Sequence, residues 1–156
     1  MIETPQVKET ADRLTAFIPL VVPRAEIQEV MGPAIREVYA VIAAQGIAPA
    51  GPWFTHHRRK PTDTFDFDVC VPVATPVTAA SRVTAGMLPA ARVARTVYRG
   101  PYEGLAAAWG EFCDWIEANG HTPRADLWEC YLVGPGPESS PDPATWRTEL
   151  VRPLVG

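Results

Sequence analysis

Glu129 and Tyr131 stand two residues apart in LWECYLVG, a segment over 127–134 that is typical of a β-strand. Side chains alternate across a strand, so these two residues should share one face. A carboxylate beside an aromatic hydroxyl can bind an organic cation, or can act as a general base next to a hydrogen-bond donor. The simpler alternative is a solvated Glu on an exposed strand, because a Glu-x-Tyr spacing also arises by chance. The spacing alone leaves these interpretations open.

The chain around this strand repeats an earlier stretch of about 44 residues at a constant offset of 74 positions. Met31 matches Leu105 at this offset, and Ile42 matches Ile116. The second copy alone places an acid, Glu129, before the aromatic position of this strand. Because a duplicated unit often brings a pseudo-twofold axis, we expect a central cleft, with its function in the residues that differ between the copies.

The second unit, residues 88–154, is predicted to have the order β-α-β-β. PAARVARTVY (89–98) alternates as a strand, and Gly100-Pro101 opens a helix that ends at Asn119-Gly120 with a left-handed glycine. The apolar helix residues recur with helical spacing: Leu105, Trp109, Phe112 and Ile116. The strand at 127–134, a loop at 135–143 and a strand at 146–154 complete the unit.

The first unit, residues 14–73, has the same predicted order, with strands near 14–22, 53–58 and 64–72 and a helical stretch at about 25–45. Gly32-Pro33 should kink this helix or split off its first turn. Segment 73–87 is interpreted as a linker. The sequence therefore predicts an α+β fold in one domain, residues 1–156. Tandem duplicated β-α-β-β units would form antiparallel sheet, with helices on one side and a ligand cleft on the other.

Strands from both units could line that cleft. The second would contribute Glu129 and Tyr131, and the first would contribute Trp53 and His57 on its matching face. A negative charge framed by aromatic rings suits a flat, lipophilic cation. Desolvation should raise the pKa of Glu129, while His57, if near, would become charged below a pH of about 6.5.

The opposite face of the 127–134 strand carries Trp128, Cys130 and Leu132 and is expected to pack under the helices. Trp109 on the second helix is a core residue in the simpler interpretation and a ligand contact in the alternative. His56 and His57 are adjacent and point to opposite faces, so we expect no metal site. We expect no cofactor either, because the chain lacks phosphate-loop and dinucleotide fingerprints.

Composition narrows the function classes. The chain has 156 residues, a net charge of -4 and a pI near 5.3, which favours one domain and disfavours nucleic acid as a partner. It has neither a long apolar run nor a signal-peptide pattern, so we expect no membrane partner and a cytoplasmic location. Cys70, Cys113 and Cys130 are an odd number, typical of reduced thiols, with a catalytic Cys as the alternative.

The run ARTVYRGPYEGLAAAWGEFCDWIEANGHTP, followed by LWECYLVGP, resembles the GyrI-like (gyrase-inhibitor-like) superfamily, which includes effector-binding domains of AraC-type and multidrug-responsive regulators. The resemblance covers about 14–154 and implies a duplicated domain with a central cleft. It also implies that the acid of the E-x-Y strand, here Glu129, contacts cationic drugs beside Tyr131. Relatives often have Tyr where this chain has His57. With about thirteen residues before the first unit, we expect a stand-alone member.

Three functions follow from these observations. The first is binding of hydrophobic, aromatic, cationic small molecules in the cleft. The second is hydrolysis of electrophilic, cyclopropane-type xenobiotics, with Glu129 as general base and Tyr131 as donor to an oxyanion. The third is a protein-binding role such as gyrase inhibition, with an unidentified protein partner.

Overall fold

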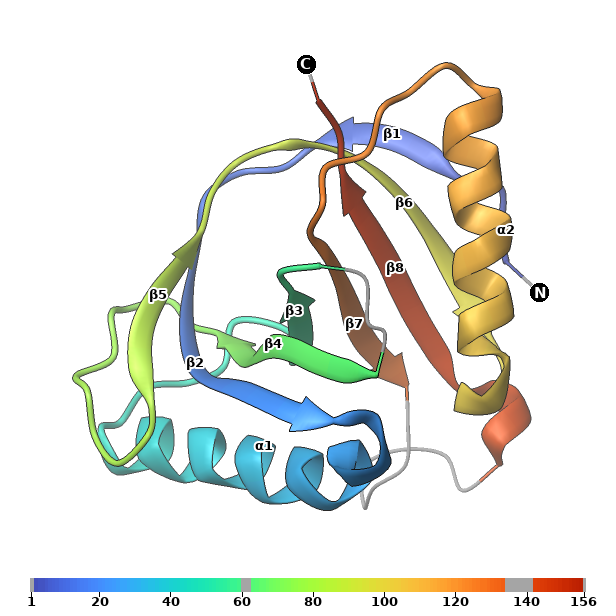
Figure 1. Ribbon diagram of the computed structural model, residues 1–156. Coiled ribbons are helices and arrows are strands. Elements are labelled where there is room, and N and C mark those ends of the chain that lie inside the picture. The colour runs from blue at the N-terminus through green and yellow to red at the C-terminus, as the bar shows by residue number, and fades with distance from the viewer. Residues whose placement is uncertain (1, 60–62, 134–141, 156) are drawn as a thin grey trace. The chain divides into compact units, whose positions relative to one another are not determined.

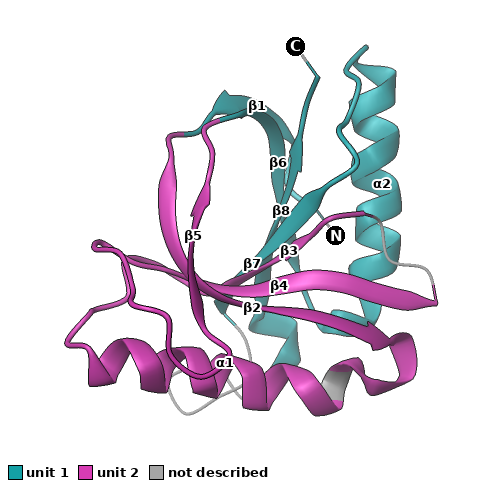
Figure 2. Cartoon of the chain, turned by 60° about the vertical axis from the view of Figure 1, so that its left-hand side comes forward, with its two compact units in different colours: residues 1–10, 91–156 teal, residues 11–90 magenta. Residues whose placement is uncertain are grey.

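The computed structural model describes residues 2–59, 63–133 and 142–155 (Figure 1). The chain forms two compact units. Unit 1 comprises residues 1–10 and 91–156, and unit 2 comprises residues 11–90 (Figure 2). Each unit combines antiparallel β-strands with one long α-helix, so the α+β class predicted from the sequence is confirmed.

Unit 2 contains β2 (Arg13–Pro23), a 3-10 turn η1 (Arg24–Glu26), α1 (Ile27–Ala44), β3 (Phe54–His57), β4 (Thr64–Pro72) and β5 (Thr84–Leu88). Its strands lie in the order β3-β4-β2-β5. The helix α1 runs along β2 and β4 (Figure 1). Apolar residues of the helix and of these two strands form one buried core, which includes Ala34, Val38, Ile42, Ile18, Phe67, Val69 and Val71.

Unit 1 contains β1 (Gln6–Glu9), β6 (Arg92–Arg99), a 3-10 turn η2 (Tyr102–Gly104), α2 (Leu105–Ala118), β7 (Leu127–Val133), a 3-10 turn η3 (Pro143–Thr145) and β8 (Arg147–Pro153). Its strands lie in the order β1-β6-β8-β7. The helix α2 lies beside β6 and β8 (Figures 1 and 2). Its core contains Ala94, Tyr98, Ala108, Phe112, Ile116, Leu150 and Leu154.

Both long helices end as their sequences predict. Gly46 follows α1 with a φ of 70°, and Gly120 follows α2 with a φ of 76°. A residue with a Cβ is strained in this left-handed conformation, so glycine lets the chain turn back toward the sheet. The next residues then bond to the last helical turn, as the His121 N–H does to the Ile116 carbonyl at 3.0 Å.

Two expectations need correction, and one strand was not expected. Of the two outcomes expected at Gly32-Pro33, the split is wrong, because α1 continues across Pro33, and the kink stays a prediction; a 3-10 turn, η1, precedes α1. Proline removes one helical hydrogen bond, but the buried face of Ala34 and Val38 keeps α1 packed on the sheet. Segment 73–87 is more than a linker, because it contains most of β5, and β1 was not expected. Most of the predicted 135–143 loop lies outside the described residues.

The start of α2 is fixed by Tyr98. Its hydroxyl donates to the Pro101 carbonyl at 2.8 Å, so the end of β6 is tied to the Gly100-Pro101 turn. Gly104 faces the same ring closely enough that a Cβ at this position would overlap the Tyr98 hydroxyl. The glycine therefore sets how near the first turn of α2 can approach the strand.

We expect Gly104→Ala to lower the free energy of unfolding by about 1–3 kcal/mol, because the new methyl group must displace the buried Tyr98. Gly110→Ala is the matched control, since a Cβ there meets nothing within 4 Å. Alanine in an exposed helical position should stabilise the protein by about 0.5–1 kcal/mol. Urea denaturation measures both. Equal effects of the two substitutions would show that Gly104 is not a packing constraint.

Candidate functional site

Glu129 of β7 holds its carboxylate between two donors within unit 1. The Trp109 indole N–H, from α2, donates to one carboxylate oxygen at 3.1 Å. The Tyr131 hydroxyl, two residues further along the strand, donates to the other at 3.2 Å. Three of the residues singled out in the sequence, Glu129, Tyr131 and Trp109, therefore meet at one carboxylate.

The face of β7 that carries Glu129 lies under α2. Glu129 is paired with Leu150 of β8, and Leu150 belongs to the core that includes Phe112 and Ile116 of α2. Cross-strand partners share a face, so Glu129 points to the helix side of the unit 1 sheet. The prediction that the opposite face, with Trp128, Cys130 and Leu132, packs under the helix is therefore wrong. Both faces carry buried residues, Leu127 on one and Trp128 and Cys130 on the other, so alternation showed which residues share a face but not which face the helix covers.

Tyr131 belongs to a chain of neighbouring aromatic rings in unit 1. The Tyr102 ring, from η2, lies edge-on to Tyr131 with 6.0 Å between ring centroids. Trp146, next to β8, lies 4.9 Å from Tyr102 by the same measure. We call Tyr102, Tyr131 and Trp146 the aromatic cluster. All three residues are half-buried, so their rings combine apolar surroundings with access from outside.

The surroundings of Glu129 disfavour the charged form of its side chain. Desolvation raises the pKa of Glu129, and the hydrogen bonds from Trp109 and Tyr131 lower it by less, so the net shift is upward. Burial and the nearby charge of Glu129 also raise the pKa of Tyr102 to about 12. The site thus holds an acid whose charge is incompletely compensated, beside a phenol that stays protonated at neutral pH.

Sequence reasoning missed Tyr102 and Trp146 as site residues. Tyr102 is the aromatic residue of the GPY motif, which places it in the first turn before α2. Trp146 directly precedes β8. Both residues lie at the ends of elements, so neither helical nor strand periodicity identifies them as site residues. The GPY motif was a signal for Tyr102 alone.

In unit 2, the strand β3 carries a different pair. Thr55 Oγ1 and His57 Nε2 share a hydrogen bond of 3.0 Å, and His57 stacks on Phe67 with 5.1 Å between ring centroids. His57 is 4% exposed. Burial, followed by the charge of His56, lowers the pKa of His57 to about 4. The expectation that His57 becomes charged below pH 6.5 is therefore wrong, because the ring is enclosed by the unit 2 core.

Trp53 is half-buried and packs against the core beneath α1. Its role in ligand binding, like that of His57, stays a prediction. Unit 2 also has a surface depression of about 290 Å³, lined by Asp12, Arg13, Leu14, Ala50, Pro72, Val73 and Ala74. None of the residues predicted to bind ligand lines it.

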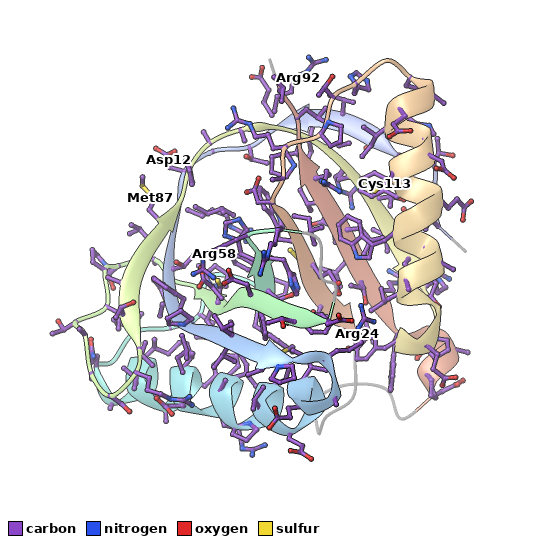
Figure 3. The ribbon with its side chains drawn as sticks, in the orientation of Figure 1. Asp12, Arg24, Arg58, Met87, Arg92 and Cys113 are labelled. Carbon is purple, nitrogen blue, oxygen red and sulfur yellow. The ribbon has the colours of Figure 1, made fainter. Side chains whose placement is uncertain are left out.

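Other polar groups have structural partners. Arg58, labelled in Figure 3, donates to the carboxylates of Asp66 and Asp68 in unit 2. Cys113, on α2, accepts from an Arg152 N–H at 3.5 Å. Within the described part of the chain, Cys70, Cys113 and Cys130 form no disulfide bond. Among the described residues, no helix combines the length and apolarity that crossing a membrane requires.

The family of the chain follows from comparison with known proteins. Residues 3–155 match the GyrI-like small molecule binding domain, so the chain belongs to that family, and the resemblance noted in its sequence is confirmed. The chain is therefore classed as a small-molecule binding domain. No curated protein matches the chain.

Solved structures share the fold at low sequence identity. The EcmrR C-terminal domain is 22% identical with a TM-score of 0.85, covering 97% of this chain and 97% of that one. Against EcmrR in a complex with DNA, also 22% identical with a TM-score of 0.84, the match covers 98% of this chain but spans only 57% of the EcmrR chain.

Two more distant structures have the same fold. SAV2435 bound to tetraphenylphosphonium is 13% identical with a TM-score of 0.66, and the match covers 99% of this chain and 95% of that one. A hydrolase from Listeria innocua is 15% identical with a TM-score of 0.68, covering 97% and 91%. At these identities the similarities establish the fold alone.

The buried His57 should make stability depend on pH in a defined window. Its pKa in the folded protein, about 4, lies below the ordinary 6.5, so the stability it contributes is complete above pH 6.5 and is lost as pH falls toward 4. We expect wild type to lose on the order of 3 kcal/mol more than His57→Phe over this range. Urea denaturation at pH 4 to 7 measures the difference.

The control is His121→Gln, which removes a half-buried histidine in a turn of unit 1. Its curve shows what loss of a histidine outside the unit 2 core does to the measured stability. Loss of the hydrogen bond between Thr55 and His57 shifts the His57→Phe curve by a constant amount and leaves the slope comparison intact. Parallel curves for wild type and His57→Phe would contradict the low pKa of His57.

Proposed function

We propose that this chain binds lipophilic organic cations at the carboxylate of Glu129 in unit 1. The observation that carries the proposal is the carboxylate of the half-buried Glu129, whose pKa is raised although Trp109 and Tyr131 donate to it. A carboxylate offers about four acceptor positions, of which these donors use two. A cation at the remaining positions would supply the charge compensation that the two neutral donors lack.

The aromatic cluster supports this ligand class. Its rings are attractive for a cation through their electron-rich faces and for apolar substituents through contact area. Family membership supports a small-molecule ligand, and SAV2435, a structure with the same fold, holds a lipophilic cation, tetraphenylphosphonium. The sequence also predicts ligand contacts for Trp53 and His57, and these contacts stay predictions.

Hydrolysis at the same carboxylate has less support. That mechanism needs Tyr131 to donate its proton to a developing oxyanion, whereas the Tyr131 hydroxyl donates to Glu129. The hydroxyl would have to turn away from the acid during the reaction. Binding requires no such rearrangement, so the contacts favour a binding domain. The protein-binding role and the cytoplasmic location stay predictions.

Methyltriphenylphosphonium should quench tryptophan fluorescence, because Trp109 donates to Glu129 and Trp146 belongs to the aromatic cluster. We expect micromolar affinity, and at least ~10-fold weaker binding of the neutral triphenylphosphine oxide. Glu129→Gln should keep the aromatic contacts, lose the charge and weaken the cation at least ~10-fold. Fluorescence titration measures the affinity of wild type for each compound and the affinity of Glu129→Gln for the cation.

Glu117→Gln is the matched control, because it removes an exposed carboxylate from α2 and changes the net charge by the same amount. It should leave the affinity within about 2-fold, as expected of an exposed, screened charge. Equal affinity for the cation and the neutral compound, or equal effects of the two substitutions, would contradict binding at Glu129.

Binding of a cation should also release protons. The raised pKa leaves part of Glu129 protonated in mild acid, and a bound cation favours the carboxylate. Affinity should therefore increase as pH rises through the pKa of the free protein and then become constant. Calorimetry of methyltriphenylphosphonium binding from pH 5 to 8, in buffers of different ionisation enthalpy, counts the protons released.

His57 should not contribute to this effect, because its pKa of about 4 keeps it neutral from pH 5 upward. His57→Phe should therefore keep the proton release, and Glu129→Gln should abolish it. Absence of proton release in wild type over the whole range would mean that the Glu129 carboxylate is already fully ionised without ligand.

A further inference from the structure

Thr148 of β8 has a buried hydroxyl that no described residue satisfies. The residue is 0% exposed, and its Oγ1 has no hydrogen-bond partner among the described residues. Leaving a buried polar group unpaired costs free energy comparable to losing a hydrogen bond, and valine would fill the same space without that cost. An unpaired hydroxyl of this kind calls for an explanation in terms of function.

The position of Thr148 places it at the candidate site. It is paired with Tyr131 on one side and with Tyr98 on the other, and paired residues share a sheet face with Cβ atoms about 4.5–5.5 Å apart. Trp146 precedes it by two residues and Leu150 follows by two along the chain. Two of these four neighbours, Tyr131 and Trp146, belong to the aromatic cluster, so Thr148 lies at its base.

The register also shifts beside this position. Tyr131 pairs with Thr148, but the next pair along the strands is Val133 with Arg147, so β7 has one extra residue at Leu132. Such bulges interrupt regular pairing and redirect the neighbouring side chains. The irregularity lies directly next to Tyr131 and Thr148, where the strand would otherwise close a regular ladder.

Unit 2 fills the position that matches Thr148 with a larger side chain. There His57 of β3 is paired with Phe67 of β4, and the two rings stack with an interplanar angle of 19°. In unit 1 the residue paired with Tyr131 is the much smaller Thr148. Unit 1 thus has a short polar side chain where unit 2 has a phenyl ring.

We propose that Thr148 is a specificity-determining ligand contact, whose hydroxyl accepts an N–H from a cation bound at Glu129. The inference rests on the proposed function and names the ligand class more narrowly. A cation that satisfies both acceptors must carry at least two N–H groups, as primary ammonium and amidinium groups do. A quaternary cation can pair with the charge of Glu129 but cannot donate to Thr148.

A matched pair of ligands tests the proposal: biphenyl-4-ylmethylammonium and its N,N,N-trimethyl derivative, which share the charge and the aromatic body. Thr148→Val should weaken the primary ammonium about 10-fold, the effect of one hydrogen bond to a charged group, and change the trimethyl compound less than about 2-fold. Thr148→Ser should retain the wild-type preference for the primary ammonium over the trimethyl compound. Isothermal calorimetry measures each affinity.

The melting temperature without ligand separates a ligand contact from a structural role. Thr148→Val removes a hydroxyl that has no partner among the described residues, so this variant should melt no lower than wild type. A lower melting temperature with unchanged affinities would overturn the proposal, because the hydroxyl would then be bound within the protein or to a permanent water. If the valine variant fails to fold, comparison of Thr148→Ser with Thr148→Ala isolates the hydroxyl.

Failure of this inference is distinguishable from failure of the proposed function. If Glu129→Gln weakens both ligands while Thr148→Val changes neither, cation binding at Glu129 stands and the role of Thr148 is wrong. Equal weakening of both ligands by Thr148→Val would also overturn it, because a hydroxyl that accepts N–H cannot act on a trimethylammonium group. If wild type binds neither ligand, the proposed function and this inference both fail.

Discussion

The carboxylate of Glu129, held between the Trp109 indole and the Tyr131 hydroxyl, is the interaction on which the candidate site depends. Two opposing effects meet there. Burial disfavours the charged form, and the two neutral donors favour it, but the balance leaves the pKa of Glu129 raised. An acid in this state gains from any partner that supplies positive charge, which is why a cation is the ligand that its surroundings favour.

The hydrogen bond between Trp109 and Glu129 requires a fixed distance between α2 and the strands of unit 1. Trp109 reaches Glu129 from the helix, and the start of the helix is set by the Tyr98 hydroxyl on the Pro101 carbonyl and by the absence of a side chain at Gly104. Packing of Phe112 and Ile116 against Leu150 holds the middle of the helix. The polar contact at Glu129 therefore follows from apolar packing that lies next to it.

Much of the fold could be predicted from the sequence, because helical periodicity, glycine stops and strand alternation are local signals. The pair Glu129 and Tyr131 followed from alternation alone. Alternation did not predict which face of β7 α2 covers. Large apolar residues stand on both faces, Leu127 on one and Trp128 on the other, and both are buried. Tyr102 and Trp146 lie outside regular periods, and the role of Thr148 depends on strand register, which one sequence does not reveal. The neutral state of His57 depends on burial beside Phe67, a long-range property of the unit 2 core.

The pKa of Glu129 itself tests the central claim most directly. With ¹³C at the glutamate side-chain carboxyl, NMR can follow its titration in the free protein and with saturating methyltriphenylphosphonium, using Glu129→Gln to assign the signal. The account predicts a pKa above the ordinary value for glutamate in the free protein and a clear decrease when the cation is bound. An ordinary pKa that is the same with and without the cation would contradict it, because Glu129 would then be a solvated acid that the ligand does not meet.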